Sequence, residues 1–473
     1  MVFSSPVFLF LFLPAVFLMD RILPDGKGKN LFLALSSVLF YAFGQLVYVP
    51  LFLFSVCLNY ASGLLLQRLD KFRKAVLWST VILNLGMLGV FKYTDFVLQN
   101  CNLAFGTRFS LPGIVLPIGI SFFTFQGMSY VIDVYRDKKA GTESFSKVLL
   151  YIAFFPQLIA GPIVKYHDIS SQIDARCTSA GETAQGIRRF IIGFAKKILI
   201  ANSVGAVSDS VFGLLSESVP DTRLAWLGAV CYMLQIYFDF SGYSDMAIGI
   251  GHMFGFSIPE NFDHPYGASS IREFWRRWHI SLSAWFREYL YIPLGGNRKG
   301  KRRTSLNRMI VFLATGIWHG ANWTFLVWGV CHGILSNLEN SGIIPVERLQ
   351  KSKIGKIAGR LYTLLAVLLL FVVFRADSLR DAGTMIRAMF SLSVRPDSTI
   401  HLVQLLNGAN IAMILLGVLF AGNLPRCFAA EACALKENKT AVLCKDIALL
   451  TIFFLSVCAM ARGGFNPFIY FQF

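Results

Sequence analysis

Charged residues are scarce in this chain of 473 residues. Asp, Glu, Lys and Arg make up only 15% of the sequence, whereas hydrophobic residues make up 55%. A soluble domain carries about 25% charged residues. The mean hydropathy is +0.57, and apolar runs of roughly 20 residues, the length that crosses a bilayer core, recur along the chain. The composition therefore excludes an ordinary soluble protein and predicts an all-α, polytopic membrane protein.

Several motifs of soluble enzymes are also missing. The nine cysteines stand singly and form no C-x-x-C pair, so neither a zinc site nor a redox pair is indicated, and no bound metal is expected. No H-E-x-x-H, G-x-S-x-G or phosphate loop occurs, which excludes the familiar metalloprotease, serine hydrolase and nucleotide sites. The N-terminus has no basic stretch with a small-residue cleavage site, so we expect its first apolar run to be a retained helix.

Acidic residues are fewer than basic ones, 27 against 44, and the net charge is +17. Lys and Arg gather after the first, third and fifth apolar segments and are rare after the second and fourth. Cytoplasmic loops of membrane proteins collect basic residues in this way. The pattern predicts an extracytoplasmic N-terminus. It also accounts for the charge without a nucleic-acid partner, for which no basic stripe with interleaved aromatic residues is present.

We expect roughly ten to twelve membrane segments, some of them re-entrant, in a single domain. Peripheral helices would occupy about residues 1–135, a catalytic core about 148–375 and C-terminal helices about 376–473. Lys196 and Lys197 interrupt the apolar segment 187–203, which suggests a helix lying at the membrane interface. The expected spans are 8–23, 31–44, 47–66, 76–91, 116–135, 148–164, 224–240, 322–335, 359–374, 403–422 and 447–460.

Polar side chains are concentrated in one stretch, between Tyr237 and His332. Five of the seven histidines lie between His252 and His332, together with several carboxylates, arginines and tryptophans. An ionisable group is costly inside lipid, so it usually faces an internal cavity and has a function. This stretch is therefore the candidate functional region.

His319 is the first candidate catalytic residue. It lies in a Trp-His-Gly motif, and an imidazole can exchange a proton near neutral pH, as acyl transfer to a hydroxyl requires. The small residues Gly316 and Gly320 would permit close approach by a neighbouring helix or a substrate. From this motif alone, a structural histidine hydrogen-bonded between helices is an equally good interpretation.

Three other polar groups each have two interpretations. His279 could hold a carbonyl or a carboxylate, or it could cap a surface helix. Asp239 and Asp245 could accept protons or bind a metal, or they could be polar packing that breaks a helix around Gly242. The basic run at 297–303 could pair with the phosphates of a nucleotide-like donor or could simply be a cytoplasmic loop.

Longer motifs in the same region resemble the membrane-bound O-acyltransferase (MBOAT) family. The resemblance is carried by residues 272–296, with the sequence REFWRRWHISLSAWFREYLYIPLGG, by YFDFSGYSDMA at 237–247, by Trp318-His319-Gly320 and by FRAD at 374–377. It extends over nearly the whole chain. Within the family, the chain looks most like the bacterial branch that O-acetylates alginate and, more distantly, like the branch that attaches D-alanine to teichoic acids.

The resemblance implies a ring of tilted helices around a tunnel that crosses the bacterial plasma membrane. It also implies that His319 is the central catalytic residue and His279 a second important polar residue. An acyl group would pass from a cytoplasmic thioester, acetyl-CoA or an acyl carrier protein, to an extracytoplasmic polysaccharide or cell-wall polymer, with the help of a partner transferase. No bound cofactor is expected.

The candidate substrate- and donor-binding residues surround the two histidines in the sequence. They are Trp275, Arg276, Trp278, Trp318, Asn322, Asp239 and Asp245. The candidate contacts to donor phosphates are Arg298, Lys299, Lys301, Arg302 and Arg303.

Other functions remain open at this point. A D-alanyl transferase that uses a carrier-protein thioester is the alternative within the same class. A solute transporter or flippase would use central histidines without consuming a thioester, although the chain shows none of the internal repeats common in transporters. A scaffold that only anchors a secreted transferase would tolerate the loss of both histidines.

Overall fold

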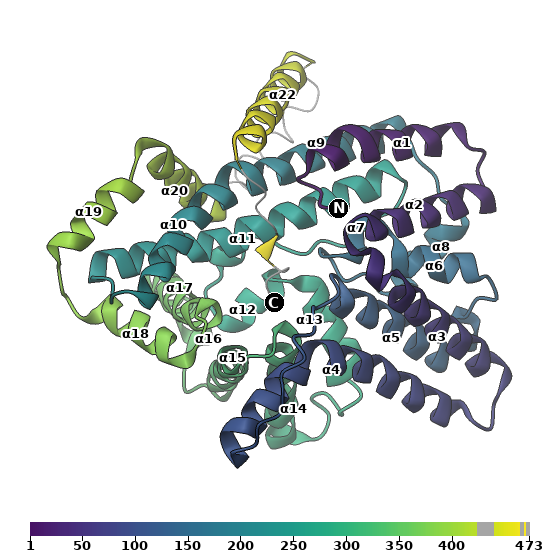
Figure 1. The fold of residues 1–473 in the computed structure, drawn as a ribbon, viewed down its shortest axis with the longest axis horizontal. Coiled ribbons are helices and arrows are strands. Elements are labelled where there is room, and N and C mark those ends of the chain that lie inside the picture. Colours follow the sequence, from purple (N-terminus) through teal and green to yellow (C-terminus); the bar gives the residue numbers. More distant parts are fainter. Residues whose placement is uncertain (423–438, 464–467, 470–473) are drawn as a thin grey trace. The chain divides into compact units, whose positions relative to one another are not determined.

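The computed structural model describes residues 1–422, 439–463 and 468–469, and every regular element in these ranges is a helix (Figure 1). The all-α prediction is therefore confirmed. By internal contacts the chain divides into two compact units. The first unit comprises residues 1–190 and 244–260, and the second comprises residues 191–243 and 261–473. The predicted ring around a tunnel and the predicted single domain stay predictions.

The first unit is held together by a core of phenylalanine rings. Phe8 and Phe40 lie 5.8 Å apart, and Phe155 packs edge-on against Phe12 at 5.4 Å. The helices of this unit, the last of which continues into the second unit, are η1 (Phe8–Phe12), α1 (Leu13–Ile22), α2 (Lys27–Gln45), η2 (Leu46–Tyr48), α3 (Val49–Arg68), α4 (Arg73–Phe105), α5 (Ile120–Arg136), η3 (Lys138–Ala140), α6 (Phe145–Ala153), α7 (Phe155–Leu158), α8 (Tyr166–Asp174) and α9 (Ala180–Ala195).

Buried charges in the first unit are paired. Asp20 is fully buried, and its carboxylate lies 2.9 Å from the guanidinium of Arg176 and 3.8 Å from the ammonium of Lys29. A buried charge without a partner would cost several kcal/mol. These three residues therefore stabilise the fold of the first unit.

The second unit contains all the candidate histidines and tryptophans named above. Helix α11 begins here and runs on into the first unit. The helices are η4 (Lys196–Ala201), α10 (Asn202–Gly213), η5 (Leu214–Ser216), α11 (Thr222–Met253), η6 (Pro265–Gly267), α12 (Ile271–Arg277), α13 (Ile280–Phe286), η7 (Arg287–Tyr291), α14 (Gly300–His319), α15 (Trp323–Ser341), α16 (Val346–Leu349), α17 (Lys353–Arg375), α18 (Leu379–Phe390), α19 (Pro396–Leu405), α20 (Gly408–Ala421) and α22 (Lys439–Arg462).

Helices α14 and α15 pack against each other in antiparallel fashion, and glycines make the contact. A Cβ on Gly316 would lie 2.5 Å from the carbonyl oxygen of Phe325, and a Cβ on Gly329 would lie 2.5 Å from that of Phe312. A Cβ on Gly320 would overlap the Phe325 ring at 2.2 Å. The close approach expected from Gly316 and Gly320 is thus confirmed, and it fixes the end of α14 that carries His319.

Among the described residues, six helical stretches are long and apolar enough to cross a membrane, or seven if α19 and α20, bent by 77°, count as one span. The larger number expected from the sequence included shorter pieces such as α6, which has nine residues. The predicted interfacial helix at 187–203 is part of a stretch of 37 residues, Ala180–Ser216, that passes the same test. Lys197 is tolerated within it because its ammonium lies 2.7 Å from the buried carboxylate of Asp239.

The predicted helix break around Gly242 is wrong. Helix α11 continues without interruption from Thr222 to Met253. A Cβ on Gly242 would lie 2.7 Å from the carbonyl oxygen of Gly193. The glycine therefore serves close helix packing, which a sequence pattern does not distinguish from a turn.

Replacing Gly329 with Ala should destabilise the second unit, since the added methyl group must push α14 and α15 apart. Overpacking of this kind costs about 1–3 kcal/mol. The measurement is the thermal unfolding midpoint of the purified protein in detergent. Gly383→Ala in α18 is the matched control, because a Cβ there meets nothing within 4 Å. Equal midpoints for the two variants would contradict the packing argument.

Candidate functional site

His319 is the last residue of α14 and is almost fully buried in a cage of aromatic rings. The ring centroids of Trp318, Trp328 and Phe374 lie 5.0, 5.1 and 5.1 Å from that of the imidazole. These rings come from α14, α15 and α17. The cage therefore places one titratable group in an apolar, water-poor environment, where its interactions with a substrate are strengthened.

His279 occupies the turn between α12 and α13 in a left-handed backbone conformation, with φ 44° and ψ 56°. A residue other than glycine adopts this conformation at a cost, and such outliers gather at functional sites. Asn261 holds the turn in place. Its backbone carbonyl accepts the N–H of Ile280 at 3.0 Å, and its Oδ1 lies 3.1 Å from the His279 Nδ1.

The contacts of Asn261 also indicate the tautomer of His279. The Asn261 Oδ1 accepts the backbone N–H of Ser281 at 3.3 Å, so this atom is an oxygen and cannot donate. The His279 Nδ1 must then carry the proton, which leaves the lone pair on Nε2. His279 lies outside the helices that qualify as spans, and burial lowers its pKa to about 3. The imidazole is therefore neutral at pH 7.

Trp318 lies between the two candidate histidines. Its ring centroid is 5.9 Å from that of His279 and 5.0 Å from that of His319. The structure thus brings together, through one indole, two residues that are 40 positions apart in the sequence. His279 does occupy the N-cap position of α13, but its side chain forms no capping hydrogen bond and is fully buried.

A third buried histidine, His332 on α15, joins the same cluster. The Trp275 Nε1–H donates to the His332 Nδ1 at 3.2 Å. Because an indole N–H can only donate, the proton of the neutral His332 ring lies on Nε2. The Trp328 ring lies 4.9 Å from His332 and 5.1 Å from His319. Among the described residues, neither the Trp328 Nε1–H nor the His332 Nε2–H has a hydrogen-bond partner.

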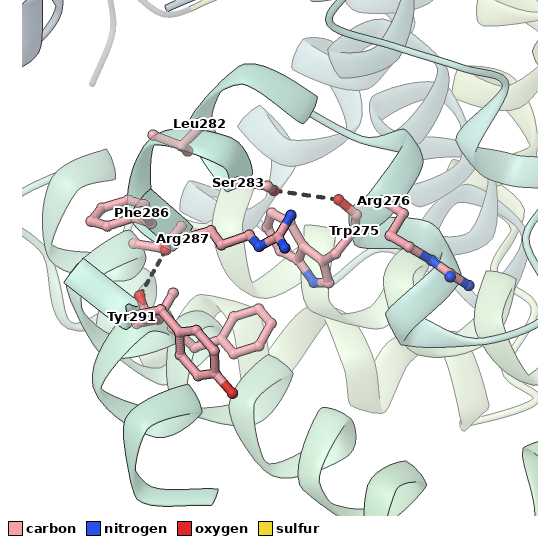
Figure 2. Close-up of a pocket in the computed structure, with 10 residues that line it drawn as sticks. Trp275, Arg276, Leu282, Ser283, Phe286, Arg287 and Tyr291 are labelled. Carbon is pink, nitrogen blue, oxygen red and sulfur yellow. Dashed lines mark hydrogen bonds between the residues drawn. The ribbon is translucent and has the colours of Figure 1, made fainter. Parts of the chain in front are cut away.

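A cavity of about 230 Å³ lies along α14 beside this cluster. Thr315, one helical turn before His319, lines it together with Trp275, Arg276, Arg287 and Tyr291. Figure 2 shows Arg287 extending toward Trp275, while Arg276 extends away from it. Neither guanidinium forms an ion pair with a described residue. The cavity can therefore take a partly anionic ligand.

The basic run at 297–303 is exposed, and its last three cations lie in the first turn of α14. Asn307 holds the preceding loop by donating to the carbonyl oxygen of Gly296 at 2.9 Å. In the part of the chain that the structure describes, none of the five candidate phosphate contacts forms an ion pair, so all five are open to an anionic ligand. They are Arg298, Lys299, Lys301, Arg302 and Arg303.

Two of the remaining candidates, Trp278 and Asn322, make packing or capping contacts within the fold. Trp278 lies in a stack of rings that includes Phe274 and Phe371, at 5.4 and 5.3 Å, and is almost fully buried. Asn322 caps α15 by accepting the N–H of Thr324 and donates to the backbone carbonyl of Asp377 at 2.8 Å. Within the described residues Trp278 makes no ring contact with His279, Trp318 or His319, and Phe274 lies between it and His332.

The two aspartates are engaged in ion pairs. Asp239 pairs with Lys197 and accepts the backbone N–H of Ile469 at 2.7 Å. Asp245 pairs with Arg189 at 2.7 Å, and the same guanidinium binds Glu260. Within the described residues no group of three or more His, Cys, Asp or Glu side chains could hold a metal. The geometry favours a packing role for both carboxylates.

Sequence reasoning missed Asn261, His332, Trp328 and Phe374. Asn261 precedes its partner His279 by 18 positions, and nothing in its local sequence marks it. His332 had a signal, because it lies in the histidine-rich stretch and follows Trp328 by one helical turn on α15. Phe374 lies in the motif FRAD, which was noted only for the family resemblance.

Comparison with known proteins gives a consistent result. Residues 44–343 match the model of the MBOAT, membrane-bound O-acyltransferase, family. The chain is 39% identical to the probable alginate O-acetylase AlgI of Azotobacter vinelandii over the full length of both. It is 36% identical to the peptidoglycan O-acetyltransferase of Helicobacter pylori, covering 89% of this chain and 86% of that protein. It is 27% identical to the teichoic acid D-alanyltransferase of Bacillus subtilis, covering 54% and 65%.

Replacing Asn261 with Ala should lower acyl transfer by at least about tenfold, since buried groups that lose a hydrogen-bond partner cost roughly 1–3 kcal/mol. The measurement is release of the free thiol from an acyl thioester by purified protein. Asn102→Ala is the control, because Asn102, near the end of α4, also accepts hydrogen bonds from a neighbouring loop, from Thr107 and Phe109. If Asn261→Ala kept full activity, the positioning of His279 by Asn261 would not be needed for acyl transfer.

Proposed function

Because the chain belongs to the membrane-bound O-acyltransferase family, we propose that it passes an acetyl group from a cytoplasmic thioester to hydroxyls of an extracytoplasmic polysaccharide or cell-wall polymer. His319 acts as the general base. The protein works in the bacterial plasma membrane with its N-terminus outside, and a partner transferase assists at the acceptor side. Acetyl-CoA is the first donor to test, and an acyl carrier protein is the second.

One observation carries this proposal: α14 connects a basic loop at its beginning to the caged His319 at its end. At 1.5 Å per residue, its 20 residues span about 30 Å. The cavity lined by Arg287 and Thr315 lies along this path. An elongated donor could therefore hold its phosphates at the exposed cations and bring its thioester toward the histidine.

The reaction follows from the groups around His319. Its imidazole takes the proton of the acceptor hydroxyl, and the hydroxyl oxygen attacks the thioester carbonyl carbon. The tetrahedral intermediate then expels the thiolate as the C–S bond breaks, and the imidazolium returns the proton to sulfur. The products are an ester and a free thiol.

The hydrogen bonds of the groups around His319 suggest what each of these groups contributes to the reaction. His279 presents a lone pair at Nε2, so it suits orienting a hydroxyl and does not suit polarising a carbonyl, the role first expected for it. The buried N–H groups of Trp328 and His332 are donors without partners among the described residues. Donors of this kind stabilise the oxyanion of an acyl-transfer intermediate.

Acetyl transfer is favoured over D-alanyl transfer by the relatives. The two O-acetylating relatives align over most of this chain, whereas the D-alanyltransferase aligns over 54% of it at lower identity. A D-alanyl donor is the second candidate. It is separated from the first by offering acetyl-CoA and a D-alanyl carrier protein to the same preparation.

Replacing His319 with Ala should reduce acetyl transfer by about 10³-fold or more, since it removes the base and leaves the hydroxyl protonated. The measurement uses labelled acetyl-CoA, purified protein in nanodiscs and crude polymer as acceptor. The exposed His401 supplies the control His401→Ala. Equal transfer by wild type and by a well-folded His319→Ala protein would show that His319 is not the general base.

Changing Arg298, Lys301 and Arg302 together to Gln should raise the KM for acetyl-CoA by about tenfold and weaken its dependence on salt. The maximal rate should change little, because these side chains bind the donor far from the thioester. A triple change of the exposed Lys351, Lys353 and Lys356 to Gln removes the same charge elsewhere. An identical KM increase in both triple variants would mean that only net charge matters.

A further inference from the structure

A second cavity, of about 240 Å³, lies in the same unit where α10 ends and α17 gives way to α18. Its lining includes Asp209, Phe212 and Ser216 from the end of α10 and the turn after it. Arg375, Asp377 and Asp381 line it from the end of α17 and the start of α18. We call it the acceptor cavity. It contains the polar residues of the motif FRAD, to which the chemistry at His319 gives no role.

Two contacts connect the acceptor cavity to His319. Phe374, the neighbour of Arg375 in the sequence, packs its ring 5.1 Å from the imidazole. Asn322, three residues after His319, donates to the backbone carbonyl of Asp377 at 2.8 Å. The cavity is thus fixed to the end of α14 that carries the histidine, whereas the basic loop lies at the other end of this helix.

The side chain of Arg375 is built into the wall of the cavity. It pairs with Asp209 at 2.8 Å, and its guanidinium carbon lies 5.2 Å from the ring centroid of Phe212. Among the described residues it donates this one hydrogen bond, although a guanidinium has five N–H donors. The arginine is therefore held in place with donors to spare.

Three carboxylates and one guanidinium line this cavity, so the lining is negatively charged overall. Asp209 pairs with Arg375, and Asp381 accepts from Ser378 at 2.6 Å, while Asp377 is exposed. Carboxylates accept hydrogen bonds from hydroxyl groups and repel other anions. The volume is below the range of about 300–1,000 Å³ common for small-molecule sites, so the cavity has room for one small ring.

We propose that the acceptor cavity binds one neutral, hydroxyl-rich sugar ring of the polymer and directs its reacting hydroxyl toward His319. The hydroxyls of this ring donate to Asp377 and accept from Arg375, and its apolar face rests on Phe212. This inference rests on the proposed acetyl transfer and adds where the acceptor binds and which class of acceptor fits.

The test measures transfer from labelled acetyl-CoA to the polymer in membranes of the cells that carry this protein, with the concentrations of donor and polymer varied separately. Asp377→Asn replaces a charged carboxylate, which accepts hydrogen bonds, with a neutral amide. Because Asp377 is exposed, this change should preserve the fold. Ser216→Trp fills the cavity from another exposed position. The matched controls are Asp397→Asn and Ser218→Trp, both exposed and outside the lining.

The expected result is a rise in the KM for polymer of at least about fivefold in Asp377→Asn and more in Ser216→Trp, because lost hydrogen bonds and lost volume weaken binding. The KM for acetyl-CoA should stay within about twofold of wild type. Both controls should match wild type in both constants.

Four other results overturn the inference in different ways. If wild type transfers nothing, the proposed function fails and the acceptor cavity fails with it. If wild type transfers acetyl and the two cavity variants keep its KM for polymer, the cavity alone is wrong. A higher KM for acetyl-CoA would assign the cavity to the donor. A lower KM for polymer in Asp377→Asn would mean that the occupant is an anion.

Discussion

The glycine contact between α14 and α15 is the constraint on which the candidate site depends. With hydrogens at positions 316 and 329, each helix rests on a backbone carbonyl of the other. Trp328 on α15 is thereby brought into ring contact with His319 on α14, and His332, one turn further along α15, contacts the same indole. Larger residues at these positions would separate the rings and open the cage.

Burial decides what each polar group can do. Lys197 and Asp239 neutralise each other at 2.7 Å, and Asp20 is matched by Arg176 and Lys29. Such paired charges leave little capacity for chemistry, since removing either partner would strand a buried charge. His279 is different because burial lowers the pKa of its imidazole and keeps it neutral. A neutral imidazole retains a lone pair that can accept a hydrogen bond from a substrate.

The second unit arranges its polar features along α14. Exposed cations lie at the start of the helix, a cavity lined by Arg287 follows along its length, and His319 ends it. The acceptor cavity is fixed to the same end by Phe374 and Asn322. A donor and an acceptor that arrive by these separate routes would meet at the histidine, and only the small acyl group would have to pass between them.

Composition and local pattern determined the membrane class and the all-helical fold, because hydropathy over about 20 residues is a local property. The motifs around His279 and His319 likewise marked the candidate site before any contact was known. Tertiary structure decided the rest. Asn261 sets the tautomer of His279, Lys197 is paired across two helices, and Gly242 packs within a helix that sequence reasoning had broken. Each depends on the atom that lies opposite in space, and hydropathy and spacing carry no information about it.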